Sequence, residues 1–242
     1  MIQFVKKYCR LTLNKIIFIF FVFFIKNAHS QSSTANNIIF KVYTQMQKAK
    51  DYKVDANIKV DLPFIRMLPI NAKIYVKQPN KFKVESKSIA IVPRQGFDQL
   101  NKILSDTNQF TSILQTTELL GKVNAKLINI IPLQDTSDLI LAKLWVDTKQ
   151  NIVLKSLLTT KSNGTILTEY TYGSFVNFGL PDIMIFTVDI KKFKIPKSIA
   201  ADINTNSKKE NDNEKKNKKG KIIITLSNYL INKGIEDIVF AK

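Results

Sequence analysis

The sequence predicts a mainly β domain of the α+β class, in which one long antiparallel sheet curls into an open half-barrel. Apolar and polar residues alternate with a period of two along several segments, as in strands with one dry and one wet face. Turn sequences such as Asn163-Gly164 separate successive strands and favour hairpins. Helical periodicity is confined to a few stretches, so only a few short helices are expected to cover the sheet.

The chain opens with a predicted signal peptide, residues 1–30. Its apolar run, Ile16 to Ile25, would cover as a helix only about half of a ~30 Å hydrocarbon core. Ala28-His29-Ser30 supplies small residues at the positions that a signal peptidase reads, so we predict cleavage after Ser30. The alternative is an uncleaved anchor, because apolar residues also occur between positions 2 and 13.

Residues 31–242 are expected to form a single domain with one core. The chain's one cysteine is Cys9, in the leader, so the mature chain has neither a disulfide nor a lipid attachment point. The net charge of the whole chain is +18. Lysine is spread along the chain without a basic-aromatic platform or zinc spacing, so we interpret the charge as a composition bias and expect no nucleic-acid partner.

A helix and a first group of strands follow the leader. An apolar face recurs at three- and four-residue intervals and predicts an amphipathic helix of about 13 residues, formed by Ile39, Val42, Tyr43, Met46 and Ala49. Alternation then predicts strands at 52–62, 72–76, 82–86 and 89–92. Residues 62–69 contain two prolines and are interpreted as a loop or sheet edge, and residues 78–80 as a turn.

Helical periodicity returns from Phe97 to Leu120. It predicts two short helices with a break at Asp106 to Asn108, and Gly121 ends the stretch. Further strands are predicted at 125–131, 139–146, 152–160, 165–173, 183–190 and 221–227. Residues 204–221 hold no apolar residue, and we predict that they form a mobile Lys-rich loop between the last two strands.

The mature chain lacks the side chains of most catalytic and transition-metal sites. His29 and Cys9 both fall in the leader and are the single residues of their kinds. The carboxylate pairs Asp135/Asp138 and Glu236/Asp237 lie among polar or terminal residues and are interpreted as solvated surface. We therefore expect no catalytic residue, no metal site and no cofactor, and we expect that the protein is not an enzyme.

The remaining candidate site is apolar, because the mouth of an open half-barrel can take an apolar ligand. The residues placed toward this interior share strands with polar neighbours on the opposite face. They are Phe64, Ile74, Phe82, Ile91, Trp145 and Phe186. For each residue taken singly, the alternative is an ordinary place in a closed core.

Four segments resemble the LolA-like family of periplasmic lipoprotein carriers and its relatives that sort outer-membrane lipoproteins. They are residues 75–96, 143–156, 180–189 and 227–240. The first, YVKQPNKFKVESKSIAIVPRQG, resembles the family's paired strands around a Pro-x-Lys/Arg-Phe turn, and the second, KLWVDTKQNIVLKS, resembles its Trp-Val-Asp hairpin. Together with the order of the predicted elements, the likeness extends over residues 34–240.

The resemblance implies a half-open, incurved antiparallel β-barrel with helices as its lid. Its cavity would bind the acyl chains of a lipoprotein or another lipid and carry them through the periplasm as a soluble monomer, with transient membrane contact. An inner-membrane donor complex and an outer-membrane receptor would be the partners. Carriers of this family hold the lid with an arginine near the cavity, and the candidates here are Arg66 and Arg94. The Lys-rich loop departs from the family pattern.

Two functions are compatible with this sequence. The first is a periplasmic carrier of lipoprotein acyl chains. The second is an envelope sensor or interaction domain of the same fold, which binds and regulates a protein partner without carrying lipid. Acyl material in protein purified from its own host distinguishes them, because a carrier contains such material and a pure interaction domain does not.

Overall fold

One antiparallel sheet forms most of the structure, a computed structural model that describes residues 28–62, 65–88, 100–162, 164–189 and 219–241. Ten strands lie in the order β4-β3-β1-β11-β10-β9-β8-β7-β6-β5, and the short β2 pairs with the end of β1. Because β4 and β5 are the two edges and do not pair with each other among the described residues, the sheet is a half-open barrel.

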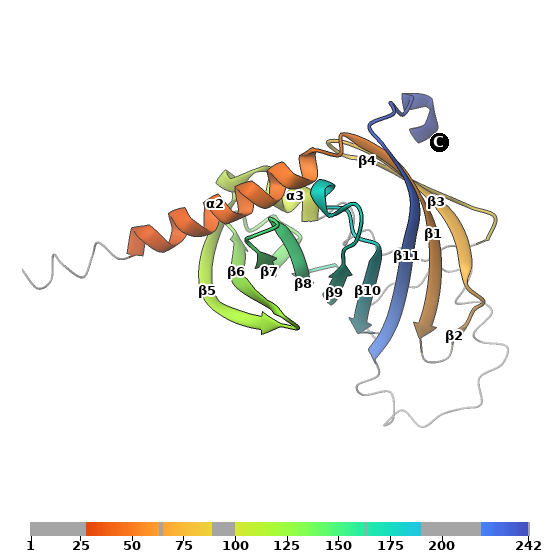
Figure 1. Ribbon diagram of the computed structural model, residues 1–242. Helices are drawn as coiled ribbons and strands as arrows, with labels where there is room; N and C mark the ends of the chain where they lie inside the picture. Colours follow the sequence, from red (N-terminus) through yellow and green to blue (C-terminus); the bar gives the residue numbers. More distant parts are fainter. Residues whose placement is uncertain (1–27, 63–64, 89–99, 163, 190–218, 242) are drawn as a thin grey trace, which may run out of the picture.

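The strands are Asp51–Leu62 (β1), Ile65–Arg66 (β2), Ile70–Lys77 (β3), Lys81–Ser86 (β4), Phe110–Leu120 (β5), Val123–Pro132 (β6), Leu139–Asp147 (β7), Ile152–Thr160 (β8), Gly164–Thr171 (β9), Ile183–Asp189 (β10) and Lys219–Ile231 (β11). The helical elements are Ala28–Gln47 (α2), Leu100–Ser105 (α3) and the short 3-10 turns Thr107–Gln109 (η2), Val176–Phe178 (η3) and Asp237–Phe240 (η5). Figure 1 shows α2 lying across one end of the curved sheet, with α3 beside it.

The cross-strand register keeps one buried face continuous from β3 to β6. Ile74 pairs with Val54, Phe186 pairs with Ile222, and all four are buried. The same alignment continues through β8 and β7, where the buried Leu144 of β7 faces Ile128 of β6. Because side chains alternate along a strand, a register held between neighbours places all these residues on the inner side of the sheet.

The predicted amphipathic helix is confirmed and is longer than expected, with 20 residues. Ile39 and Val42 are buried against the sheet, Tyr43 and Met46 are half-buried, and Ala49 is buried just beyond the helix. The polar residues ahead of this face contain neither glycine nor proline, so nothing in them stops the helix. No described helix is long and apolar enough to cross a membrane.

The prediction of a helix over residues 110–120 is wrong, because this segment is the edge strand β5. Phe110 and Ser112 are buried while Thr111 between them is exposed, which is the alternation of a strand. A register shift between Leu114 and Thr116 interrupts this alternation, and the interrupted spacing resembles helical periodicity. Helical structure is confirmed only before it, as α3 and η2.

The short β2 lies in the segment predicted as a loop or sheet edge, and the remaining described strands lie where the alternation predicted them, including β8 at residues 152–160. The last strand is longer than predicted: β11 begins at Lys219, so the end of the segment taken for a Lys-rich loop, residues 219–221, belongs to the sheet. The strand predicted at 89–92 and the rest of the predicted loop, residues 204–218, lie outside the described residues.

Candidate functional site

The inner face of the sheet beneath α2 is the candidate site. Of the residues predicted to face it, Ile74 and Phe186 are fully buried in the core, and Phe82 packs half-buried against it. These three side chains lie on the inner face, and their contact with a ligand stays a prediction. Four other predicted residues lie outside the described residues or have no described side chain: Phe64, Arg66, Ile91 and Arg94.

The prediction that Trp145 faces the interior is wrong. Trp145 is buried in a separate small cluster with Ala125 and Leu127, on the outer side of the sheet. Its indole Nε1 donates a hydrogen bond of 2.7 Å to Oε2 of Glu118, and Nζ of Lys155 lies 4.9 Å from the ring centroid. The sequence hides this orientation, because apolar residues precede and follow Trp145 and both sides of β7 are buried here.

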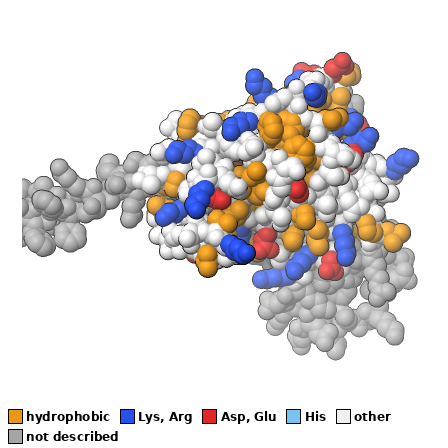
Figure 2. Space-filling view, viewed as in Figure 1, with side chains coloured by type: hydrophobic (Ala, Val, Ile, Leu, Met, Phe, Trp, Pro, Cys, Tyr) orange, Lys and Arg blue, Asp and Glu red, His pale blue; other side chains and the backbone are white. Residues whose placement is uncertain are grey.

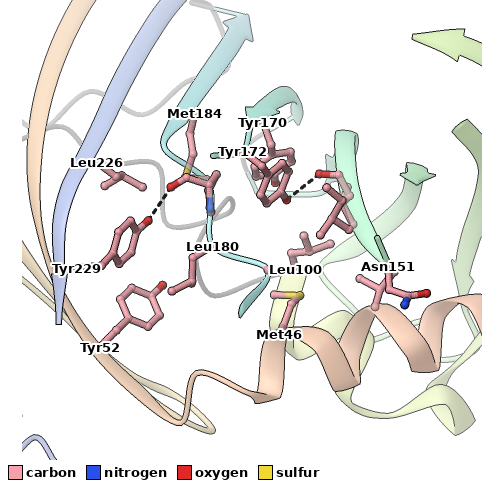
Figure 3. A pocket seen from close by; sticks show the side chains of 15 residues that line it. Met46, Tyr52, Leu100, Asn151, Tyr170, Tyr172, Leu180, Met184, Leu226 and Tyr229 are labelled. Atoms are coloured by element: carbon pink, nitrogen blue, oxygen red, sulfur yellow. Dashed lines mark hydrogen bonds between the residues drawn. The ribbon is translucent and has the colours of Figure 1, made fainter. Parts of the chain in front are cut away.

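A small cavity lies where the C-terminal half of α2 meets the sheet (Figure 3). Four tyrosines contribute to its wall, Tyr52, Tyr170, Tyr172 and Tyr229, with apolar side chains from α2, α3, β8, β10 and β11. Its volume is about 60 Å³, which is room for about two water molecules at ~30 Å³ each. A second cavity of about 40 Å³ adjoins it and continues toward the β3–β4 turn.

A larger hollow of about 1250 Å³ lies along β1, β3 and the connection between β2 and β3. It is open to solvent, and charged side chains from Asp55, Lys73 and Glu85 lie along it. Size alone would favour this hollow as a binding site. An alkyl chain needs an enclosed apolar surface, however, so the cavities beneath α2 are the better candidates.

Hydrogen bonds hold three of the cavity tyrosines in place. The hydroxyl of Tyr229 donates to the carbonyl oxygen of Pro181 at 2.7 Å, and that of Tyr172 donates to the carbonyl oxygen of Val153 at 2.8 Å. The hydroxyls of Tyr170 and Ser156 lie 3.2 Å apart. Burial raises the pKa of all three phenols, that of Tyr170 to about 12, so they are neutral at physiological pH.

Polar contacts join α2 to the structure beneath it. Near the middle of the helix, the hydroxyl of Ser112 on β5 donates a 2.5 Å hydrogen bond to Oδ1 of Asn36. Closer to the C-terminus, Nε2 of Gln45 donates to the carbonyl oxygen of Val176 in η3 at 3.2 Å. The helix is therefore attached to both the sheet edge and η3 by directional contacts, in addition to its apolar face.

The C-terminal end of α2 is the most firmly fixed part. Nε2 of Gln47 donates to Oδ1 of Asn101 in α3 at 3.2 Å, and Nδ2 of Asn101 donates to Oε1 of Gln78 in the β3–β4 turn. Just beyond the helix, Nδ2 of Asn232 donates to the carbonyl oxygen of Lys48 at 2.8 Å.

Gly179 allows the loop after η3 to approach α2 closely. Its φ of +66° lies in the left-handed region, which favours glycine. A Cβ atom at this position would lie 3.4 Å from Cγ and 3.5 Å from Cα of Met46. The sequence places residues 179–181 between the strands predicted at 165–173 and 183–190 and gives no sign that they touch the helix.

The tyrosine cluster was also missed. Tyr170 and Tyr172 are two residues apart on one strand, which was a usable signal that both point to the same side. Tyr52 and Tyr229 join this cluster only in the folded sheet. They lie on β1 and β11, which pair with each other although they are far apart in the sequence. No group of three or more His, Cys, Asp or Glu side chains within the described ranges is placed to hold a metal ion.

The comparisons with known proteins bear on the fold. No protein-family model and no curated protein sequence matches the chain. Among solved structures, a LolA-superfamily protein from Nitrosomonas europaea is similar, with 11% identity and a TM-score of 0.56 over 86% of this chain and 97% of that one. A domain assigned to outer-membrane lipoprotein sorting from Vibrio parahaemolyticus has 9% identity and a TM-score of 0.55 over the same shares.

A DUF1329 family protein from Desulfovibrio piger is similar as well, with 12% identity and a TM-score of 0.52 over 87% of this chain and 97% of that one. In each case the likeness spans nearly the whole of the other structure, so it concerns the complete half-barrel and not one hairpin or helix. The resemblance expected from the sequence is confirmed for the architecture, and the chain has the LolA-like fold.

Proposed function

We propose that the protein is an envelope carrier that holds the acyl chains of a lipoprotein or another lipid between α2 and the inner face of the sheet. The observation that supports it best is the continuous apolar inner face of a sheet that is open along one side and covered by a helix. Such a cover can move away without breaking any strand pairing. The likeness to a lipoprotein-sorting domain supports the same function.

The proposal requires an opening movement, because the cavities beneath α2 are closed to an acyl chain. Ligand sites usually occupy several hundred Å³, whereas these cavities measure about 60 and 40 Å³. The moving part would be α2, whose Ile39 and Val42 would exchange contacts with the sheet for contacts with the alkyl chain. Replacing one apolar partner by another keeps apolar area buried, which limits the free energy of opening in the presence of lipid.

The cellular part of the proposal follows the sequence. The chain would lose residues 1–30 on export and work as a monomer in the periplasm, receiving its cargo from an inner-membrane donor complex and passing it to an outer-membrane receptor. Figure 2 shows lysine side chains spread over the visible face and not gathered in one patch. Such a surface supports brief contact with anionic head groups, since each basic group near the membrane contributes about 1 kcal/mol.

Mass spectrometry of the protein purified from its own host under non-denaturing conditions tests the proposal. The expected result is acyl material bound to a chain that begins near Gln31. If the protein carries no acyl material and also takes none from anionic phospholipid vesicles, the carrier function is wrong. The regulatory interaction domain would then be the better description.

A further inference from the structure

Tyr52 differs from the other tyrosines of the cavity. It is the second residue of β1, only 8% of its surface is exposed, and its ring lies 5.8 Å from that of Tyr229, centroid to centroid. Its hydroxyl nevertheless forms no hydrogen bond with any described residue, whereas the hydroxyls of Tyr229 and Tyr172 are both bonded to carbonyl oxygens. Figure 3 shows the Tyr52 side chain directed into the cavity beside Leu180.

The hydroxyl is not sealed off, because among the described residues the one fully buried side-chain polar atom without a partner is Oδ1 of Asn129. A hydroxyl that borders a cavity and has no partner among these residues is available to donate a hydrogen bond to a ligand there. Four residues line both cavities beneath α2, namely Met46, Tyr52, Gly179 and Leu180. Among these shared residues, the Tyr52 hydroxyl is the one polar side-chain group, so a ligand that extends through both cavities passes it where Met46 and Leu180 supply the neighbouring apolar surface.

We propose that the hydroxyl of Tyr52 donates a hydrogen bond to the carbonyl oxygen of an acyl chain, so that the site selects ester- or amide-linked acyl groups over alkyl chains without a carbonyl. This inference rests on the proposed carrier function and names the chemical class of its cargo. The alkyl part would follow the inner face beneath α2, and the carbonyl would lie at the junction of the two cavities.

The surroundings of Tyr52 suit this role. The turn before β1 is held by Asn232, whose Oδ1 accepts a 2.8 Å hydrogen bond from the backbone N–H of Lys50. Tyr52 is therefore fixed in position before a ligand binds. Burial raises the pKa of its phenol above the ordinary value, so the group keeps its proton and remains a donor throughout the physiological range.

Calorimetric titration with two single-chain probes tests the inference. The probes are myristoyl lysophosphatidylglycerol, which has an ester carbonyl, and its tetradecyl ether counterpart, which has none. For Tyr52→Phe we expect the affinity for the ester probe to fall about three- to tenfold, the effect of one hydrogen bond. The affinity for the ether probe should equal that of the wild type.

The melting temperature provides a second measurement. Because Tyr52→Phe removes a hydroxyl without a partner, the variant should melt no lower than the wild type. The matched control is Tyr75→Phe on the outer face of β3, where Nζ of Lys53 lies 5.7 Å from the ring centroid. This control should leave the affinity for both probes unchanged.

The outcomes separate this inference from the function on which it rests. If the wild type binds both probes and Tyr52→Phe changes neither affinity, or lowers both equally, the assignment to Tyr52 is wrong and the carrier function stands. If the wild type binds neither probe, the proposed function fails and this inference fails with it.

Discussion

The hydroxyl of Ser112 donates a 2.5 Å hydrogen bond to Oδ1 of Asn36, and this contact connects α2 to the edge strand β5. Ser112 is fully buried on the inner face, while Asn36 is half-buried on the helix. A buried hydroxyl needs a partner, and the partner here is on the helix that, under the proposed carrier function, would move for lipid to enter. The pair is therefore placed to act as a latch that holds the helix closed when the site is empty.

Ser112→Ala tests the latch. The change removes one hydrogen bond, and the amide of Asn36 can turn to water, so the free energy of unfolding should fall by only about 1 kcal/mol. The rate of lipid release should rise, because closing of α2 is weakened. Urea denaturation measures the first effect, and stopped-flow release of a fluorescent fatty acyl lipid measures the second.

Ser156→Ala is the matched control. Ser156 is also fully buried, but its hydroxyl lies near that of Tyr170 and not near α2. We expect a similar loss of stability without faster release. Equal release rates in the two variants would show that the bond to Asn36 does not control opening.

A disulfide between positions 36 and 112 should lock the lid. Residues 31–242 contain no cysteine, so Asn36→Cys with Ser112→Cys creates a single pair in this part of the chain, at a point where side chains already touch. In the oxidised form we expect lipid uptake to stop, and reduction should restore it. The two single-cysteine variants control for the substitutions themselves, and undiminished uptake by the oxidised double variant would rule out entry beneath α2.

The fold was predictable to a large extent because alternation is a local property of the chain. A strand such as β1 shows an unbroken period of two, so its position and inner face could be read directly. The edge strand β5 was mistaken for a helix because its register shift disturbs that period. The error lies where a bulge makes the local pattern ambiguous.

The site was less predictable, for a different reason. Ile74 could be placed because it alternates with polar neighbours, but the apolar Ile185 directly precedes Phe186. Trp145 lies in β7, where both faces are covered and the pattern gives no direction. The contacts of Asn36 with Ser112 and of Gly179 with Met46 join residues far apart in the chain. No local pattern contains such contacts, because they follow from how α2 packs on the finished sheet.

Gly179→Ala should strain the backbone where the loop after η3 contacts α2. For a residue with a Cβ, the left-handed conformation lowers the free energy of unfolding by about 1–2 kcal/mol. The new methyl group would lie 3.4 Å from Cγ of Met46, in van der Waals contact. We expect lower stability together with faster hydrogen exchange in the C-terminal half of α2. Gly121→Ala is the control, because Gly121 has φ +60° and nothing within 4 Å of its Cβ position. Equal protection of α2 in the two variants would contradict a role for Gly179 in seating the helix.

Asp237 should make a pH-dependent contribution to stability. Its carboxylate lies 2.7 Å from Nζ of Lys77 and 2.8 Å from Nζ of Lys81, which docks η5 on the β3–β4 hairpin. Hydrogen bonds and the positive charge of these lysines lower its pKa from 3.8 to about 2. The stabilisation is therefore fully present above about pH 4 and is lost as the pH falls toward 2.

Thermal melts of the wild type and of Asp237→Asn between pH 6 and pH 2 test whether this stabilisation is lost on acidification. The wild type should melt higher than the variant at pH 6, and the difference should shrink as the pH approaches 2. Because the carboxylate is at the surface, added salt should also reduce the difference. Glu236→Gln removes a neighbouring charge that forms no ion pair with described residues, and it should show no such dependence. A difference that grows on acidification would contradict the assignment.

Tryptophan fluorescence can show which side of the sheet receives lipid. Trp145 is the chain's single tryptophan and lies on the outer face, bonded to Glu118 and covered by Lys155. A ligand on the inner face should therefore leave its emission unchanged.

Met46 lines both cavities, so Met46→Trp in a Trp145→Phe background places the reporter beside the ligand, and its emission should shift when an acyl lipid is added. The larger ring will overfill the closed cavity to some degree, so the fold of this variant is first checked by circular dichroism. A response from Trp145 with none from position 46 would place the lipid on the outer face, and α2 would then have no part in binding it.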